Sequence, residues 1–294
     1  MKQLFSGIGV ALVTPFTTDN KIDYTALKKI IQHVVDGGAD YLAVNGTTGE
    51  ASTLSENEKR ELLAFVHRQK PSDIPILFGI GANNTQHVLD TIDTTDMSLV
   101  DGILTVCPYY NKPTQEGVYQ HYKTIAKHTK KPIILYNVPG RAAINMTAET
   151  VIRLSKIENI IGVKDASGDL EQAMKITKYT SKSFLLISGD DILTIPMITV
   201  GAKGAISVLA NAIPEQFCDM VNQGLEQDFS EAQEILLSIL ELNDLMYAEN
   251  SPVGVKTLMH ELKLCDTNVR LPLVKASEKL VSDIQEQVSI LSLS

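Results

Sequence analysis

Eight short apolar or β-branched segments alternate with longer amphipathic segments in the first 211 residues of this 294-residue chain. A run of strand–helix repeats of this kind predicts an α/β fold, the (β/α)8 or TIM barrel. After residue 211 the strand-like segments stop, and Leu, Glu and Gln recur at helical spacing. We therefore expect a catalytic barrel over residues 1–211 and a C-terminal helical extension over residues 212–294.

The expected strands are short runs rich in Val, Ile, Leu and other apolar residues. They cover residues 7–13, 41–45, 76–79, 102–106, 133–137, 160–164, 184–188 and 204–208. A doubly wound sheet is the competing α/β fold. No Gly-x-Gly-x-x-Gly motif follows the first expected strand, which favours the barrel.

Amphipathic segments fill the intervals between these strands. They cover residues 24–36, 56–68, 85–94, 115–128, 148–155, 170–180 and 192–200. The second of them begins with a capping box, in which Ser55 caps the helix and Glu58 stands three residues on. In the extension we expect two or three helices, among them residues 231–247 and 252–261.

Composition narrows the class of protein. The net charge of −9 and the lack of basic runs argue against nucleic-acid binding. No stretch of about 18 apolar residues predicts a membrane span, and the first residues lack the apolar core of a signal peptide. Cys107, Cys218 and Cys265 are too far apart to indicate a disulfide framework or a zinc site. We expect a cytoplasmic protein.

Lys164 closes the expected strand 160–164, where a solvated charge is out of place. Burial disfavours the ammonium form and lowers the pKa, and a neutral lysine can form a Schiff base with a carbonyl substrate. The alternative is a lysine that extends past the strand end to water. Tyr136 precedes Lys164 by 28 residues, one strand–helix repeat. We therefore expect its phenol beside the amine, where it could transfer protons.

Other polar residues collect after the expected strands, where TIM barrels carry their active sites. Thr47 and Thr48 stand between two glycines and offer hydroxyls and accessible N–H groups for a small carboxylate. An ordinary glycine-rich loop is the alternative. Arg141 follows the fifth strand, and its guanidinium group suits bidentate binding of a carboxylate, although a surface charge would look the same.

Tyr109 and Tyr110 follow the fourth strand, between prolines that would hold them stiffly. The alternative is an ordinary loop packed by its aromatic side chains. Gly189, after the seventh strand, allows a ligand to approach the backbone closely. We expect Asp190 and Asp191 to be the N-cap and a first-turn residue of the next helix rather than catalytic acids. The six histidines form no metal-binding spacing, so we expect no catalytic metal.

Four motifs resemble those of one superfamily in their order and spacing, over nearly the whole chain. They cover residues 46–50, 108–113, 136–141 and 162–165. The superfamily is that of dihydrodipicolinate synthase and N-acetylneuraminate lyase, which are lysine-dependent pyruvate aldolases on a TIM barrel. The pair Thr47–Thr48 resembles the synthase branch, since the lyases have Ser-Thr there. Arg141 points the same way, because the lyases lack this arginine.

The resemblance implies a reaction between pyruvate and L-aspartate 4-semialdehyde with no organic cofactor. Pyruvate would form an imine with Lys164, and the N–H groups of the Thr47–Thr48 turn would hold its carboxylate. The derived enamine would attack the aldehyde, whose own carboxylate Arg141 would bind.

The resemblance also implies a shared site. Tyr136, Thr47 and Tyr110 match a proton relay in which the last tyrosine comes from a neighbouring subunit. Gly189 and Ile206 match pocket positions that act through their backbone. A homo-oligomer follows, a tetramer in most of the family and a dimer in some members.

Two other functions stay open. One is a related pyruvate aldolase that acts on a sugar-derived 2-keto acid. The other is a catalytically silent barrel that binds a keto acid as a sensor. Arg141 argues against the first, and the complete set of Lys164, Tyr136, Thr47 and Tyr110 argues against the second, since a binder has no need of the lysine.

Lysine-sensitive members of the family carry a regulatory site at a subunit interface. The matching positions here are Ala51, Ser52, Glu56, Lys59, Asn83, His87 and Tyr109. Lys59 replaces a histidine and His87 replaces a glutamate, and both changes disfavour an effector with two ammonium groups. We therefore expect weak or no inhibition by lysine, unless Lys59 points to solvent and has no influence.

Overall fold

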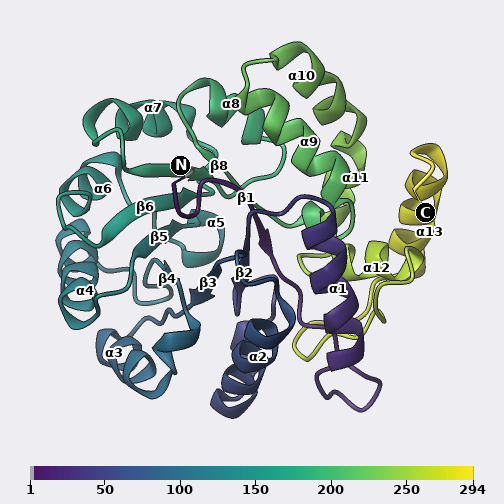
Figure 1. Cartoon of the computed structure of the whole chain (residues 1–294), viewed down its shortest axis with the longest axis horizontal. Coiled ribbons are helices and arrows are strands. Elements are labelled where there is room, and N and C mark those ends of the chain that lie inside the picture. Colours follow the sequence, from purple (N-terminus) through teal and green to yellow (C-terminus); the bar gives the residue numbers. More distant parts are fainter. Residues whose placement is uncertain (1–2, 294) are drawn as a thin grey trace.

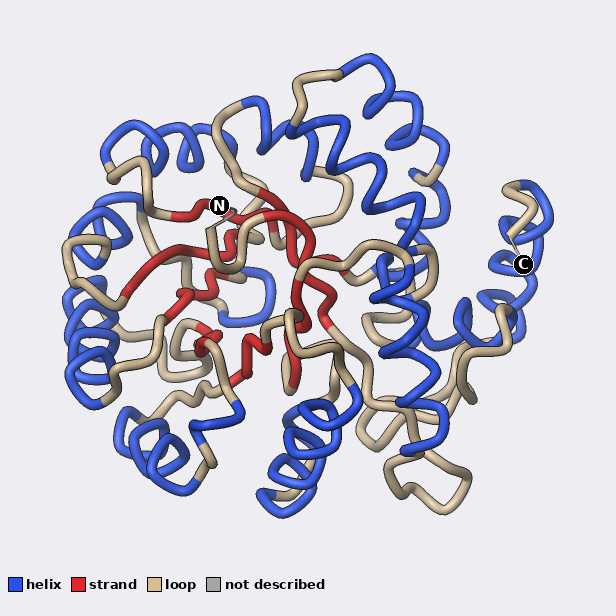
Figure 2. The backbone as a smooth tube through the Cα atoms, viewed as in Figure 1, coloured by secondary structure: helices blue, strands red, loops and turns tan. Residues whose placement is uncertain are grey.

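The computed structural model describes residues 3–293, which form a closed barrel of eight parallel strands in sequence order (Figure 1). The predicted fold class is confirmed. Figure 2 shows the strands at the centre and helices around them. The strands are β1 (Gly7–Ala11), β2 (Tyr41–Val44), β3 (Ile76–Gly79), β4 (Gly102–Val106), β5 (Ile133–Asn137), β6 (Ile160–Asp165), β7 (Leu185–Ser188) and β8 (Gly204–Ser207).

Helices alternate with the strands, as the amphipathic segments predicted. Those of the barrel are α1 (Tyr24–Asp36), α2 (Glu56–Gln69), α3 (Thr85–Thr94), α4 (Gln115–His128), α5 (Pro139–Ala142), α6 (Ala148–Leu154), α7 (Leu170–Tyr179), α8 (Thr194–Thr199) and α9 (Pro214–Leu225). The capping box of Ser55 and Glu58 is present at the start of α2. Short 3₁₀ turns η1 (Ala51–Thr53), η2 (Met97–Leu99) and η3 (Leu209–Asn211) complete the connections.

The expectation of two or three helices after residue 211 is wrong. Residues 212–293 hold five, because α9 is followed by α10 (Phe229–Ser238), α11 (Leu240–Tyr247), α12 (Val253–Glu261) and α13 (Glu278–Ile290). The segment expected as one helix over 231–247 is broken at Ile239, whose N–H bonds the carbonyl of Leu237. Since α9 follows β8 and packs on α1 and α8, we propose to count it as the eighth barrel helix, with the separate extension beginning at α10.

The barrel strands are buried on both faces, as parallel strands in α/β proteins are. Side chains including Tyr41, Leu77, Ile134 and Leu185 fill the barrel interior. A larger apolar layer lies between the strands and the helices. This packing leaves the carboxyl ends of the strands as the place where polar side chains can meet a ligand.

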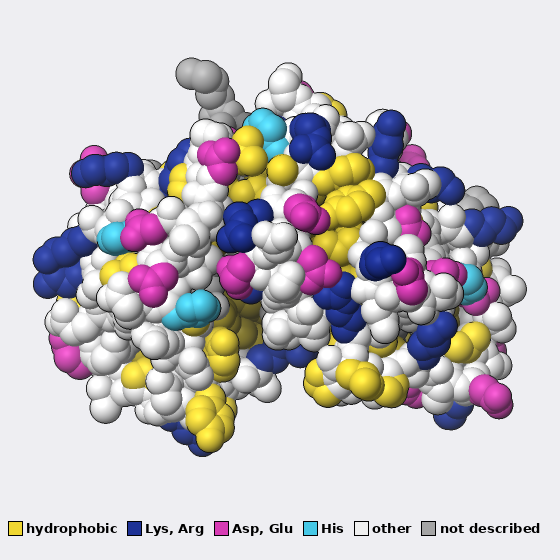
Figure 3. Space-filling view, turned by 90° about the horizontal axis from the view of Figure 1, so that it is seen from below, with side chains coloured by type: hydrophobic (Ala, Val, Ile, Leu, Met, Phe, Trp, Pro, Cys, Tyr) yellow, Lys and Arg dark blue, Asp and Glu magenta, His cyan; other side chains and the backbone are white. Residues whose placement is uncertain are grey.

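Charged side chains of both signs are interspersed on the face seen in Figure 3, which is notched between two lobes. Within residues 3–293, no helix has the length and apolar character needed to cross a membrane.

Candidate functional site

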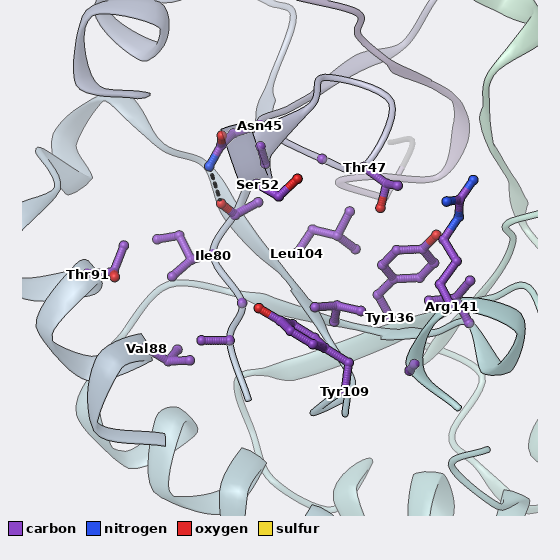
Figure 4. A pocket seen from close by; sticks show the side chains of 18 of the residues that line it. Asn45, Thr47, Ser52, Ile80, Val88, Thr91, Leu104, Tyr109, Tyr136 and Arg141 are labelled. Atoms are coloured by element: carbon purple, nitrogen blue, oxygen red, sulfur yellow. Dashed lines mark hydrogen bonds between the residues drawn. The ribbon is translucent and has the colours of Figure 1, made fainter. Parts of the chain in front are cut away.

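A cavity of about 560 Å³ opens at the carboxyl ends of β2 to β5. Figure 4 shows Thr47, Tyr136 and Arg141 together at one end of it, with Val88 and Thr91 at the other. Three of the sequence-predicted residues, Thr47, Tyr136 and Arg141, therefore line one cavity at the face of the barrel where active sites lie.

Lys164 and Tyr136 lie side by side. Strands β5 and β6 pair these two residues directly, as the 28-residue spacing predicted. The Lys164 side chain is 5% exposed, and its Nζ lies 4.6 Å from the centre of the Tyr136 ring. Burial lowers the pKa of Lys164 to about 8; the Asp191 carboxylate opposes this shift and the Arg141 guanidinium adds to it. The lysine does not extend to water, and a useful fraction of it is neutral near neutral pH.

The Tyr136 phenol faces polar partners at the cavity. Burial raises the pKa of Tyr136, while the charge of Arg141 and a hydrogen bond with Thr47 oppose the increase. Arg141 comes from the short helix α5, which begins directly after β5 with Pro139 at its first position. One strand and the turn that follows it thus present both the phenol and the guanidinium group.

The turn after β2 offers free donors. Within residues 3–293, the backbone N–H groups of Thr47 and Thr48 have no acceptor. Thr48 is buried and Thr47 is exposed. Two adjacent unpartnered N–H groups can bind a small anion such as a carboxylate.

A buried ion pair holds this turn from the far end of the chain. Glu50 adopts a left-handed backbone conformation and is 2% exposed. Its carboxylate accepts hydrogen bonds from Lys256 Nζ at 2.5 Å and from the N–H of Arg270 at 2.9 Å. Lys256 Nζ also donates to the carbonyl of Asn268 at 2.9 Å. The sequence does not predict this ion pair, since nothing in it connects partners 206 residues apart.

Gly189 lies close to Lys164, and Ile206 lies in the barrel interior. A Cβ atom at Gly189 would come within 2.9 Å of Lys164 Cε and 3.1 Å of Lys164 Cγ. Glycine at this position therefore leaves room for the lysine side chain itself, in addition to any ligand. Ile206 is 1% exposed and packs with the apolar side chains inside the barrel.

The expectation that Asp191 is a first-turn residue of the next helix is wrong. The α8 helix begins at Thr194 without a side-chain cap, whereas Asp191 accepts hydrogen bonds from the N–H groups of Val208 and Leu209 at 3.0 and 2.8 Å. Burial raises the pKa of this carboxyl group to about 6. It lies close enough to Lys164 to stabilise the ammonium form. A sequence of two aspartates after a strand could not show which direction the second would face.

Tyr110 does not reach the cavity of its own chain. Its side chain is 87% exposed with a positive φ of 73°, while the neighbouring Tyr109 lines the cavity. A tyrosine presented outward in this way is free to enter another molecule.

The cavity also takes in most of the positions that match a regulatory site. Its lining includes Ala51, Ser52, Lys59, His87 and Tyr109. The Lys59 ammonium forms an ion pair with Glu56 at 2.7 Å. Lys59 therefore lines the cavity with its charge paired to Glu56, and its influence on an effector stays a prediction.

Three comparisons relate this chain to known proteins. A model of the dihydrodipicolinate synthetase family matches residues 4–291. The 4-hydroxy-tetrahydrodipicolinate synthase of Cytophaga hutchinsonii is 49% identical, over 96% of this chain and 95% of that protein. Its counterpart in Flavobacterium psychrophilum is 47% identical, over 95% of each. A solved dihydrodipicolinate synthase from Acinetobacter baumannii, complexed with pyruvate, is 36% identical with a TM-score of 0.95 and covers 98% of this chain and 99% of its own.

Proposed function

The chain belongs to the dihydrodipicolinate synthetase family, a family of lyases, and we propose that it condenses pyruvate with L-aspartate 4-semialdehyde through a Schiff base on Lys164. This is the reaction that gives 4-hydroxy-tetrahydrodipicolinate, in the route to diaminopimelate and lysine. The observation that carries the proposal is the buried amine of Lys164, with its pKa lowered to about 8, over the ring of Tyr136.

Pyruvate enters first. The free N–H groups of Thr47 and Thr48 bind its carboxylate. The neutral amine of Lys164 then adds to the keto carbon, and water leaves to give the imine. Loss of a methyl proton gives an enamine, so the lysine serves as the electron sink and no organic cofactor is needed.

The semialdehyde enters second. Its carboxylate binds the guanidinium group of Arg141, which holds the aldehyde near the enamine carbon. Carbon–carbon bond formation places negative charge on the aldehyde oxygen, and the Tyr136 phenol donates a proton to it, relayed by the hydrogen-bonded Thr47. The amino group of the adduct then attacks the imine carbon, closes the ring and releases Lys164.

The relay is completed by a second copy of the chain. Tyr110 is exposed and lies outside the cavity of its own chain. Each chain would therefore supply Tyr110 to the proton relay of a neighbouring subunit. We propose accordingly that the enzyme is a homo-oligomer, with a tetramer favoured over a dimer. We also propose that it acts in the cytoplasm.

Borohydride trapping tests the proposal. Incubation with pyruvate and sodium borohydride should add a reduced pyruvyl group at Lys164, located by mass spectrometry of peptides. Lys256 is a matched control within the same chain, since it is also buried and its pKa is also lowered, but it is ion-paired with Glu50. Lys164→Ala should abolish trapping without loss of folding. Adduct on a different lysine, or none, would contradict the proposal.

A rate assay with each aldehyde separates the remaining alternatives. Turnover with the semialdehyde supports the proposed reaction, whereas turnover only with sugar-derived aldehydes would favour the related aldolase. A protein that traps pyruvate but turns over neither would favour the sensor.

A further inference from the structure

Directly beyond Tyr136 and Lys164, strands β5 and β6 pair a second couple of residues, Asn137 and Asp165. Successive side chains of a strand point to opposite faces. Tyr136 and Lys164 meet inside the barrel, so Asn137 and Asp165 lie on its outer face, under the helices. Both are buried, at 0% and 2% exposure, and the amide of Asn137 donates to the carboxylate of Asp165 at 3.0 Å.

The Asp165 carboxylate is surrounded by donors. Besides Asn137, the N–H and the hydroxyl of Ser167 donate to it, each at 3.1 Å. The amide of Gln172, on α7, donates at 3.4 Å. Asn145 joins the network by accepting from Asn137 at 2.7 Å and donating to Gln172 at 3.0 Å. An ionised carboxylate, which only accepts hydrogen bonds, matches all of these donors, whereas an amide would turn its own N–H₂ group toward some of them.

The network also secures the segments that carry the rest of the site. The side-chain oxygen of Asn137 accepts from the N–H of Met146, just after the helix that bears Arg141. The carbonyl of Asp165 accepts from the N–H of Gly189 at 2.8 Å, at the end of β7. Strands β5 and β6, the segment after α5 and the end of β7 are thereby connected through one buried cluster.

The register between β5 and β6 is irregular before it reaches this cluster. Ile133 pairs with Ile160 but Ile134 pairs with Gly162, so Ile161 is an extra residue on β6. A bulge of this kind disrupts the ladder locally, and a shift of register by one residue would turn every later side chain to the opposite face. Beyond the bulge, a specific contact is needed to favour the register that pairs Lys164 with Tyr136 over a register shifted by one residue.

We propose that Asn137 and Asp165 are positioning residues that fix the register of β6 against β5 beyond the bulge, and so set the amine of Lys164 against the phenol of Tyr136. The inference rests on the proposed role of Lys164. In this proposal, Asn137 and Asp165 hold the strands so that the residues directly before them, Tyr136 and Lys164, face each other.

Asp165→Asn tests the inference, because it keeps the shape of the side chain but presents an amide N–H to donors. A displaced lysine should lower kcat and the rate of borohydride trapping at saturating pyruvate by about 10- to 100-fold. KM for each substrate should stay within about threefold, since the residues that bind the carboxylates are unchanged.

Asn159→Asp is the matched control at the opposite end of β6. Asn159 donates to the carbonyls of Ala126 and Thr129 at 3.0 and 2.9 Å. An aspartate there would place a carboxylate against these two carbonyls, so the change also mismatches hydrogen-bond partners, but at a distance from the site. It should lower the melting temperature and leave kcat within about twofold of the unchanged protein.

The outcomes are separable. If the unchanged protein traps pyruvate on Lys164 but Asp165→Asn keeps its kcat, or loses no more than Asn159→Asp, the positioning role is refuted and the proposed function stands. If the unchanged protein traps nothing, the proposed function itself fails. Should Asp165→Asn not fold, Ser167→Ala removes the hydroxyl that donates to Asp165 and accepts from the N–H of Asp169. A kcat lowered about threefold with KM retained supports the inference, and an unchanged kcat refutes it.

Discussion

If Lys164 forms the imine as we propose, its lowered pKa predicts a defined dependence of the rate of imine formation on pH. With a pKa of about 8, about one lysine in ten is neutral at pH 7, against about one in 3,000 for an ordinary lysine with a pKa of 10.5. Burial therefore enriches the nucleophile about 300-fold at neutral pH. The initial rate of pyruvate trapping should rise about tenfold from pH 6 to pH 7 and level off above about pH 8.

Two variants test the cause of this profile. Asp191→Asn removes the anion that favours the ammonium form, so the plateau should begin at lower pH. Arg141→Ala removes a cation that disfavours it, so the plateau should begin at higher pH. Trapping rates measured by mass spectrometry under quenched conditions give both profiles. A rate that continues to rise tenfold per pH unit beyond pH 9 would refute the idea that burial prepares the lysine.

The same shift affects folding stability. The pKa of Lys164 is lower in the folded state than in the unfolded state, so between pH 8 and 10.5 the unfolded chain binds more protons, and stability rises with pH across that window. The difference of about 2.5 units corresponds to about 3 kcal/mol. Lys164→Met should therefore be more stable than the unchanged protein at pH 7, by an amount that disappears near pH 10.5 in urea denaturation curves. A variant less stable at pH 7 would show that the ammonium group is not the strained element.

Four further perturbations have defined outcomes. Arg141→Ala should raise KM for the semialdehyde about tenfold or more through loss of a charge-assisted hydrogen bond, whereas equal increases of both KM values in steady-state assays would contradict its assignment. Tyr110→Phe should lower kcat more than it changes KM, and a mixture of Tyr110→Phe and Lys164→Ala proteins should recover activity once subunits exchange; no recovery after demonstrated exchange would mean that each site is built from one chain. Lysine should inhibit weakly or not at all because the Lys59 ammonium lines the cavity, and half-inhibition by submillimolar lysine would oppose this expectation. Lys256→Met should leave a buried carboxylate without its cation and destabilise the fold by about 3–5 kcal/mol, lowering the melting temperature by roughly 6–10 °C; a shift below about 2 °C would show that the pair contributes little.

The sequence predicted those parts of the site that depend on repetition along the barrel. Tyr136 and Lys164 are one strand–helix repeat apart, and in a closed parallel barrel such residues lie at equal heights on adjacent strands. Thr47 and Arg141 could be placed for the same reason, since each follows a strand whose position was clear.

Contacts that join distant parts of the chain could not be predicted in this way. The partner of Glu50 lies 206 residues further on, in a helical extension whose packing no periodicity defines. Asp191 stands where a first-turn residue of a helix is expected, and only the folded β8 loop shows that its carboxylate bonds Val208 and Leu209 instead. The bulge at Ile161 leaves no mark in an apolar run that looks continuous.

The buried ion pair of Glu50 has a consequence for the order in which the enzyme is made. The turn with Thr47 and Thr48 leaves the ribosome early, but the cation and the backbone N–H that hold it, from Lys256 and Arg270, are among the last parts to be translated. Until they arrive, the carboxylate lacks the partners it has in the finished enzyme. We therefore expect a chain that ends before Lys256 to lack the contacts that hold Glu50, and with them the finished form of the turn that we propose binds pyruvate.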